Sequence, residues 1–115
     1  MPWQKDDTYS YSIGELKQIA AHYEDYGPGR GFNIIEYKAD FDMALTAIGR
    51  GYWDGRIEGK KFGMFKGFGR RQQMIIADIF GISNSELWRM GFYSIGKLRY
   101  RAYTEMANHL NGGKE

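Results

Sequence analysis

Glycine recurs at every fourth position in the middle of the chain, from Gly51 through Gly67. On a helix each of these glycines would cost about 1 kcal/mol relative to alanine, so we expect a loop or a short hairpin here. The sequence on both sides carries apolar residues at spacings of three and four, which is typical of amphipathic helices. The 115 residues are therefore predicted to form one all-α domain of about five helices, with a glycine-rich basic insert at residues 50–69.

Residues 12–49 are predicted to form an amino-terminal helical part. Ser12 and Glu15 have the spacing of a capping box, so the first helix should begin at Ile13 and continue toward the Gly-Pro-Gly sequence at 27–29. A second helix is expected at about 34–48, although residues 32–35 also fit a short strand.

Two acids of the second helical segment, Asp40 and Asp42, fall on the side opposite its apolar residues. Paired acids on an amphipathic helix are usually a solvated face, and we interpret them in this way rather than as a carboxylate site.

Residues 70–110 are predicted to form three further helices. The first begins at Arg70 and ends near Gly81, a suitable C-cap. Ser83 and Glu86 have capping-box spacing, which indicates a short second helix. Its apolar side chains, which we expect to pack inward, are Leu87, Trp88 and Met90.

The third of these helices is predicted to follow a turn at Gly91, where glycine can adopt positive φ. Ser94 is placed to cap this helix, which should extend to about Leu110. Its apolar stripe consists of Ile95, Leu98, Ala102, Met106 and Leu110.

The charge of the chain is unevenly distributed. The net charge is only +2, but residues 1–45 carry four bases against eight acids, giving −4, and the remainder carries 12 bases against six acids, giving +6. An acidic end joined to a basic remainder indicates contact with nucleic acid through one face.

The glycine-rich insert contributes strongly to this basic character. Residues 50–71 hold seven bases and two acids, interleaved with aromatic residues at 52, 53, 62, 65 and 68. The rings and cations can bind a nucleic-acid strand, or the rings can cover the core while the cations face solvent. The cations expected to contact a phosphate backbone or strand are Arg56, Lys60, Lys61, Lys66, Arg70 and Arg71.

Three helices in series, with a short middle helix and a basic final helix, are the pattern of a helix-turn-helix. The last helix of such a unit lies in the major groove, so its front needs side chains that reach base edges and phosphates. The candidate DNA-binding residues are Tyr93, Ser94, Lys97, Arg99, Tyr100, Arg101 and Thr104.

Several short runs within residues 68–110 support this interpretation. They are Arg-Arg-Gln-Gln-Met-Ile-Ile at 70–76, Ser-Glu-Leu at 85–87, Met-Gly-Phe at 90–92, Ser-Ile-Gly-Lys-Leu at 94–98, and Tyr-Arg with Glu-Met at 100–106. In this order they resemble sigma-factor region 4 and the related bacteriophage late-gene regulators of the ArpU and RinA type. The turn before the final helix is one residue longer than in those families. The resemblance implies promoter-DNA binding and contact with RNA polymerase.

The chain contains few residues of the types that serve in catalysis or metal binding. The chain has no cysteine, and its two histidines, His22 and His109, lack a second ligand at metal spacing. No nucleophile, base and orienting group can be assembled, so we expect no enzyme, metal or cofactor. The chain also lacks an apolar run long enough for a membrane span, and its start lacks the apolar core of a signal peptide, so we expect a protein of the bacterial host cytoplasm.

Two functions follow from these features. The first is a phage or prophage transcriptional regulator that binds double-stranded DNA, with RNA polymerase contact and homodimer formation left open. The second is a phage-encoded interaction module that inhibits a host enzyme or nuclease through its basic aromatic surface, since aromatic and arginine side chains dominate protein interfaces.

Overall fold

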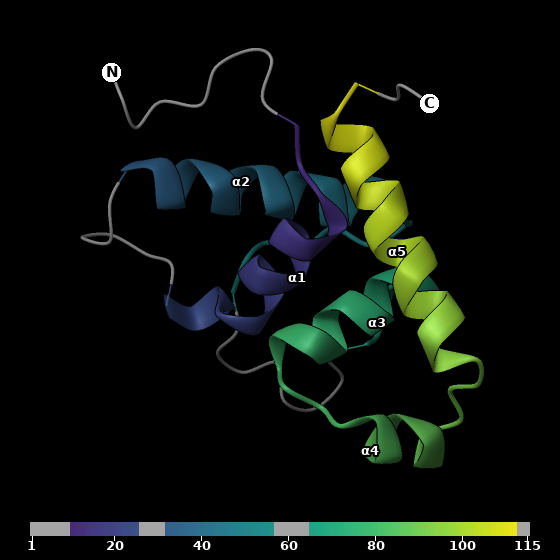
Figure 1. The fold of residues 1–115 in the computed structure, drawn as a ribbon. Helices are drawn as coiled ribbons and strands as arrows, with labels where there is room; N and C mark the ends of the chain where they lie inside the picture. The colour runs from purple at the N-terminus through teal and green to yellow at the C-terminus, as the bar shows by residue number, and fades with distance from the viewer. Residues whose placement is uncertain (1–9, 26–31, 57–64, 113–115) are drawn as a thin grey trace.

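A computed structural model describes residues 10–25, 32–56 and 65–112, and every regular element in these ranges is a helix (Figure 1). The all-α prediction is confirmed. The strand considered at residues 32–35 is wrong, because this stretch opens a helix. The elements are α1 (Ile13–Ala21), a 3-10 turn η1 (Tyr23–Asp25), α2 (Phe32–Ala47), α3 (Arg70–Ile79), α4 (Asn84–Arg89) and α5 (Ile95–Leu110).

The capping box predicted for α1 is present. The Ser12 hydroxyl accepts from the Glu15 N–H at 3.1 Å, and the Glu15 carboxylate accepts from the Ser12 N–H at 3.0 Å. The α-helix ends at Ala21, earlier than predicted, and the chain tightens into η1. This change leaves Tyr23 buried, with its hydroxyl donating to Asp42 of α2.

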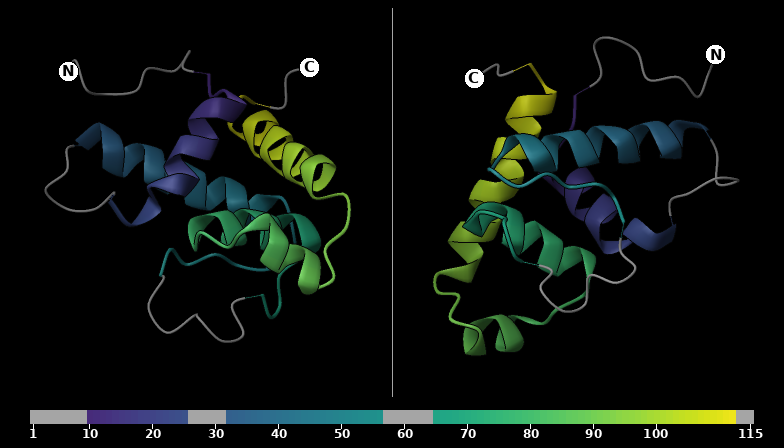
Figure 2. Two further views of the ribbon diagram at one scale, coloured as in Figure 1. Left: turned by 60° about the horizontal axis from the view of Figure 1, so that its bottom comes forward. Right: turned by 180° about the vertical axis from the view of Figure 1, so that it is seen from behind.

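Helices α1, α2, α3 and α5 enclose the main apolar core, with α3 packed against the other three (Figures 1 and 2). The glycine-rich insert adds two rings to this core, since Trp53 and Phe68 are buried and their ring centroids lie 6.2 Å apart. For these two rings the packing interpretation of the insert is correct. The core also contains Leu16, Ile19, Phe41, Leu45, Ile75, Ile76, Ala102, Tyr103 and Met106.

The fully buried Gln72 of α3 joins the two ends of the glycine-rich insert. Its carbonyl oxygen accepts from the N–H groups of Gly51 at 3.1 Å and Gly69 at 3.0 Å. Its amide donates to the carbonyls of Gly51 at 2.7 Å and Leu45 at 3.0 Å. One side chain therefore satisfies backbone groups that α2 and the insert would otherwise bury without partners.

The glycines at the start of the insert permit this close approach. A Cβ atom at Gly49 would lie 2.2 Å from the Gln72 carbonyl oxygen, and one at Gly51 would lie 2.4 Å from the Phe68 ring. Residues 57–64, with Lys60, Lys61 and any hairpin they form, lie outside the described residues, so the predictions for them stay untested.

A second, smaller apolar cluster attaches α4 to the rest of the protein. It combines Met74 and Ala77 of α3 with Leu87 of α4 and Phe92 of the following turn. The predicted capping box of α4 is present, and Gly91 has the expected positive φ of 93°. Only the Leu87 side of α4 is buried, and the helix lies at the edge of the molecule, joined to α5 by a short turn (Figures 1 and 2).

Replacement of Gln72 tests its role in closing the insert. Gln72→Ala should lower the free energy of unfolding by about 3 kcal/mol, because it leaves a cavity and several buried backbone groups without partners. Urea unfolding followed by circular dichroism measures this change. Gln18→Ala, the same substitution on the exposed face of α1, should change stability by less than about 0.5 kcal/mol. Equal small effects in both variants would contradict the role assigned to Gln72.

Candidate nucleic-acid interface

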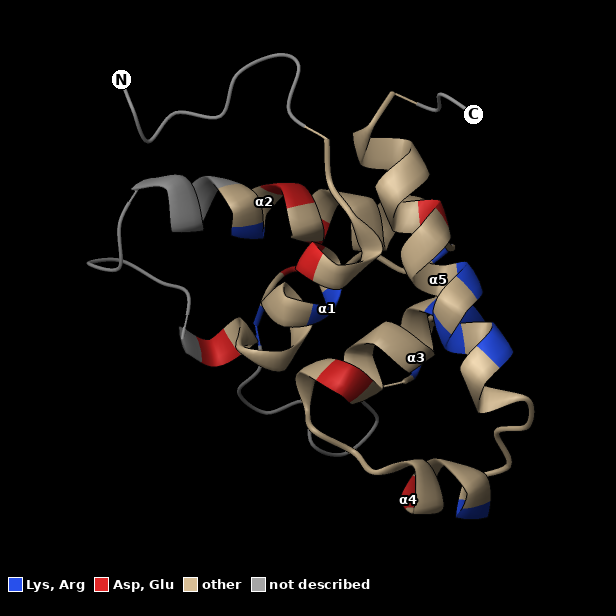
Figure 3. Ribbon diagram, viewed as in Figure 1, with Lys and Arg blue, Asp and Glu red and all other residues tan. Residues whose placement is uncertain are grey.

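The first half of α5 exposes three of the predicted DNA-binding residues, Lys97, Tyr100 and Arg101. Their spacing of three and four places them along one side of the helix. Figure 3 shows basic residues gathered along this half of α5 and at the end of α4. Within the described part of the chain, Lys97 and Arg101 form no ion pair.

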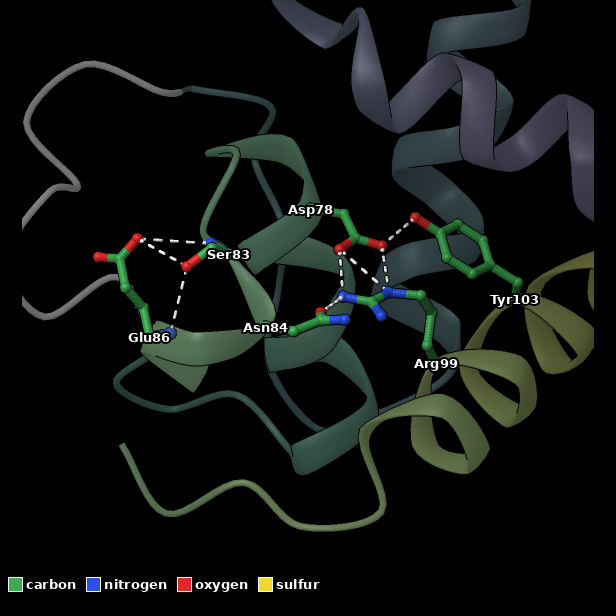
Figure 4. A network of polar contacts seen from close by, with 6 residues as sticks. All are labelled: Asp78, Ser83, Asn84, Glu86, Arg99 and Tyr103. Carbon is green, nitrogen blue, oxygen red and sulfur yellow. Dashed lines mark hydrogen bonds and ion pairs between the residues drawn. The ribbon is translucent and has the colours of Figure 1, made fainter. Parts of the chain in front are cut away.

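Arg99, also predicted to face DNA, points into the protein (Figure 4). Its guanidinium binds Asp78 of α3 in a two-pronged ion pair, with nitrogen–oxygen distances of 3.0 and 3.1 Å. It also donates to the side-chain carbonyl of Asn84, the first residue of α4, at 3.1 Å. Its Nε and Nη2 groups are therefore engaged by other helices, so Arg99 is not a candidate base contact.

Tyr103 lies beside Arg99 and is not part of the apolar stripe predicted for this helix. Its ring is fully buried, and its hydroxyl donates to the second oxygen of Asp78 at 2.7 Å (Figure 4). Burial is the main cause that raises the pKa of Tyr103, and the neighbouring carboxylate raises it further. Asp78 thus links α3 to two successive turns of α5.

Ser94 is exposed but does not cap α5 as predicted, and Thr104 is not exposed as predicted. Ser94 occupies the N-cap position of α5, but its backbone is left-handed, with φ of 52°, and its side chain makes no capping hydrogen bond. Left-handed geometry differs from the extended backbone of a serine cap, which explains the missing bond. Thr104 is half-buried with its hydroxyl shielded from solvent, so it does not belong to the exposed face.

The cations predicted to contact phosphate divide into two groups. Arg56 and Lys66 are exposed. Arg70 and Arg71 both make contacts within the protein. The Arg70 guanidinium lies 4.1 Å from the centre of the Phe92 ring and donates to the Gly91 carbonyl at 3.1 Å. The Arg71 guanidinium pairs with Glu105 at 2.9 Å, and both side chains are partly exposed.

Two residues of the α4 region that we expected to pack inward are exposed instead. The exposed fraction is 60% for Trp88 and 47% for Met90. Trp88 contacts the exposed Tyr93, with ring centroids 5.1 Å apart and an angle of 85° between the planes. The α4–α5 corner therefore presents rings to solvent beside the basic face of α5.

The interpretation of Asp42 as part of a solvated face is wrong. Asp42 is half-buried and accepts hydrogen bonds from the Tyr23 hydroxyl and, at 3.0 Å, from the Trp53 indole. Burial raises the pKa of the Asp42 carboxyl, and the two hydrogen bonds oppose this effect in part. Asp40 is likewise engaged, since it accepts from the Tyr11 hydroxyl at 2.6 Å.

Comparisons with protein-family models, curated proteins and solved structures found no match for this chain. Within the described residues, no three His, Asp or Glu side chains are grouped so as to hold a metal ion. The same part of the chain contains no helix of the length and apolarity needed to cross a membrane.

The structure predicts different consequences for two arginines of α5. Arg99→Ala should lower the free energy of unfolding by about 2 kcal/mol, because it leaves the partly buried Asp78 carboxylate without its cation. Arg101→Ala removes an exposed guanidinium and should change stability by less than about 0.5 kcal/mol. Urea unfolding of both variants makes the comparison. Similar losses in the two would contradict the distinction between an inward and an outward arginine.

The environment of Asp42 predicts a pH-dependent stability. Its pKa is raised in the folded state, so its contribution to stability is present at low pH and is lost as the pH rises through that pKa. Asp42→Asn keeps an oxygen acceptor and removes the charge. The stability of this variant relative to the wild type should be greatest at neutral pH and decline as the pH falls toward 3.8.

Urea unfolding between pH 7 and pH 3, on the wild type and on Asp42→Asn, measures the difference. Glu24→Gln, which removes an exposed carboxylate, serves as the control. A difference that stays constant or grows as the pH falls would contradict the burial effect at Asp42.

Proposed function

We propose that this protein binds double-stranded DNA, with α3, α4 and α5 acting as a helix-turn-helix and α5 entering the major groove. The observation that carries the proposal is the outward face of α5, where Lys97, Tyr100 and Arg101 are exposed and the two cations lack partners in the described chain. Long cationic side chains on an exposed helix suit the phosphates and guanine edges of a major groove.

The packing of α5 supports this role. Its inward side is fixed by Ala102, Tyr103 and Met106 in the main core, and by the contacts of Ile95 and Leu98 with the second cluster. A helix of 16 residues is about 24 Å long, so its first half can enter a groove while its second half stays packed. The outward face is thus held in one orientation, which a base-reading helix requires.

The α4–α5 corner would supply contacts to the phosphate backbone. Arg89 is exposed at the end of α4, and Tyr93 is exposed just before α5. Arg70 would support DNA binding partly in an indirect way, since its contacts with Gly91 and Phe92 hold the turn that presents Tyr93. A hydroxyl and a guanidinium near the start of the groove-facing helix would help to fix its register on DNA.

The biological role that we propose is transcriptional regulation in a phage or prophage, with contact to RNA polymerase as part of it. The support is the resemblance of the 68–110 motifs to sigma-factor region 4 and to phage late-gene regulators. The exposed rings at Trp88 and Tyr93 favour a second candidate, in which the same corner binds and inhibits a host protein.

The test is DNA selection followed by affinity measurement. Random duplexes are selected with the whole protein, and binding to the selected site is measured for the wild type, Lys97→Ala, Arg101→Ala and Lys17→Ala. The first two substitutions should each weaken binding by about 1–3 kcal/mol and reduce sequence preference, because they remove groove contacts. Lys17 is an exposed cation on α1, so its substitution controls for the loss of one positive charge.

Failure to select or shift any duplex at low salt would contradict the proposal. A stoichiometric host protein recovered from nuclease-treated lysate, with Trp88→Ala abolishing its capture, would instead support the inhibitor candidate. Equal effects of Lys17→Ala and Lys97→Ala on affinity would indicate that charge alone is responsible, without a defined reading face.

A further inference from the structure

Three aromatic side chains are exposed around the proposed DNA-binding face. The exposed fractions are 60% for Trp88, 66% for Tyr93 and 60% for Tyr100. They come from α4, from the turn and from the second turn of α5 respectively. Large rings usually gain stability by leaving water, so their exposure at one corner of a small protein points to a ligand surface.

The arrangement of the rings leaves room for a flat ligand. Trp88 and Tyr93 meet edge to face, with 85° between their planes, so the two rings do not cover each other by stacking. The turn that holds Tyr93 is fixed from behind, because Phe92 is buried and Arg70 stacks on its ring. The rings are therefore presented on a supported surface.

Cations accompany these rings. Arg89 follows Trp88 directly in α4, Lys97 lies in the first turn of α5, and Arg101 follows Tyr100. All three cations are exposed and lack partners in the described part of the chain. Rings interleaved with cations suit a strand with accessible bases, because phosphates bind the cations and unpaired bases stack on the rings.

An intact duplex offers no free base faces on which such rings can stack. Its bases are stacked on each other, and a protein reaches only their edges in the grooves. A protein ring can stack on a base only where that base has left the duplex stack. The free-energy cost of unstacking is lowest where base pairs are already open. The ring surface thus distinguishes between intact DNA and opened DNA.

We propose that the α4–α5 corner recognises locally unpaired DNA next to a duplex segment. This inference rests on the proposed function. Lys97 and Arg101 hold the duplex, and Trp88 and Tyr93 stack on unpaired bases at the junction. The charge of the corner favours nucleic acid over an apolar protein surface as the occupant of the ring pair.

The experiment compares three DNA probes made from one sequence. They are an intact duplex, the same duplex with a central bubble of about four mismatched pairs, and one of its single strands. Affinities are measured for the wild type, Trp88→Ala, Tyr93→Ala and Tyr52→Ala. Tyr52 is a matched control, because it is an exposed tyrosine, at 76%, on the segment that follows α2.

The wild type should bind the bubble at least 10-fold more tightly than the duplex. Trp88→Ala should lower affinity for the bubble about 10-fold and leave duplex affinity within about 2-fold, since stacking is lost and groove contacts remain. Tyr93→Ala should lower affinity for the bubble by a larger factor than affinity for the duplex, because it removes a stacking ring as well as the proposed phosphate contact. Tyr52→Ala should behave as the wild type. Trp88→Phe retains an aromatic ring and should keep most of the preference for the bubble over the duplex. This result would show that the loss of preference in Trp88→Ala is not caused by loss of folding.

Tryptophan fluorescence gives a second readout. Trp53 is fully buried, whereas Trp88 is exposed, so stacking of a base on Trp88 should quench emission. The quenching caused by the bubble should be lost in Trp88→Phe.

The outcomes separate this inference from the proposed function. Equal affinity for duplex and bubble in the wild type, or a preference that survives both ring-to-alanine substitutions, overturns the inference and leaves duplex binding in place. Absence of binding to all three probes overturns both. Loss of duplex affinity in the ring variants, equal to the loss on the bubble, shows that the rings serve the duplex and also overturns the inference.

Discussion

The ion pair between Arg99 and Asp78 acts together with the apolar contacts of α5 to fix which side of this helix faces solvent. Successive residues of an α-helix are rotated by about 100°, so positions two places before and after Arg99 lie nearly opposite to it. These positions are Lys97 and Arg101. Because Arg99 is held inward by Asp78, and Tyr103 binds the same carboxylate, the two cations point outward. The orientation of the candidate DNA-binding face is thus supported by polar contacts made on the reverse side of the helix.

Helix α3 holds a second polar anchor at its other end. Gln72 binds the backbone on both sides of the glycine-rich insert, and Asp78 binds α5 six residues later. The insert is therefore closed at its base by a side chain of the central helix. This geometry explains glycine at 49 and 51, where a Cβ atom would collide with Gln72 or Phe68. In the described parts of the insert, the glycines that recur at every fourth position do not lie in a helix.

Local signals in the sequence predicted most of the helices, because capping and apolar spacing act within a few residues. The capping boxes at Ser12 and Ser83 and the positive φ at Gly91 are examples. The inward polar residues were missed, since each is stabilised by a partner distant in the sequence. A signal existed for Arg99. It is spaced by three and four from the buried Ala102 and Tyr103, so it extends the buried stripe of α5 by one turn.

Some of the bases behind the +6 charge of residues 46–115 are engaged within the protein and are not available for binding. Arg99 and Arg71 are paired with acids, and Arg70 is engaged with the turn. Around the α4–α5 corner, the exposed cations that have no partner within the described chain are Arg89, Lys97 and Arg101. Three phosphate contacts on a duplex correspond to a logarithmic salt slope of roughly −3, which is modest for a DNA-binding protein.

Electrostatic attraction of this size is modest. Other contacts would therefore have to supply a large share of the free energy of any tight binding. The side chains at the same corner that can supply it are Trp88, Tyr93 and Tyr100, which are exposed next to the cations. Stacking of a base on such a ring contributes about 1–3 kcal/mol and depends little on salt. A corner with few free cations and several free rings is therefore better suited to DNA whose bases are accessible than to a uniformly paired duplex.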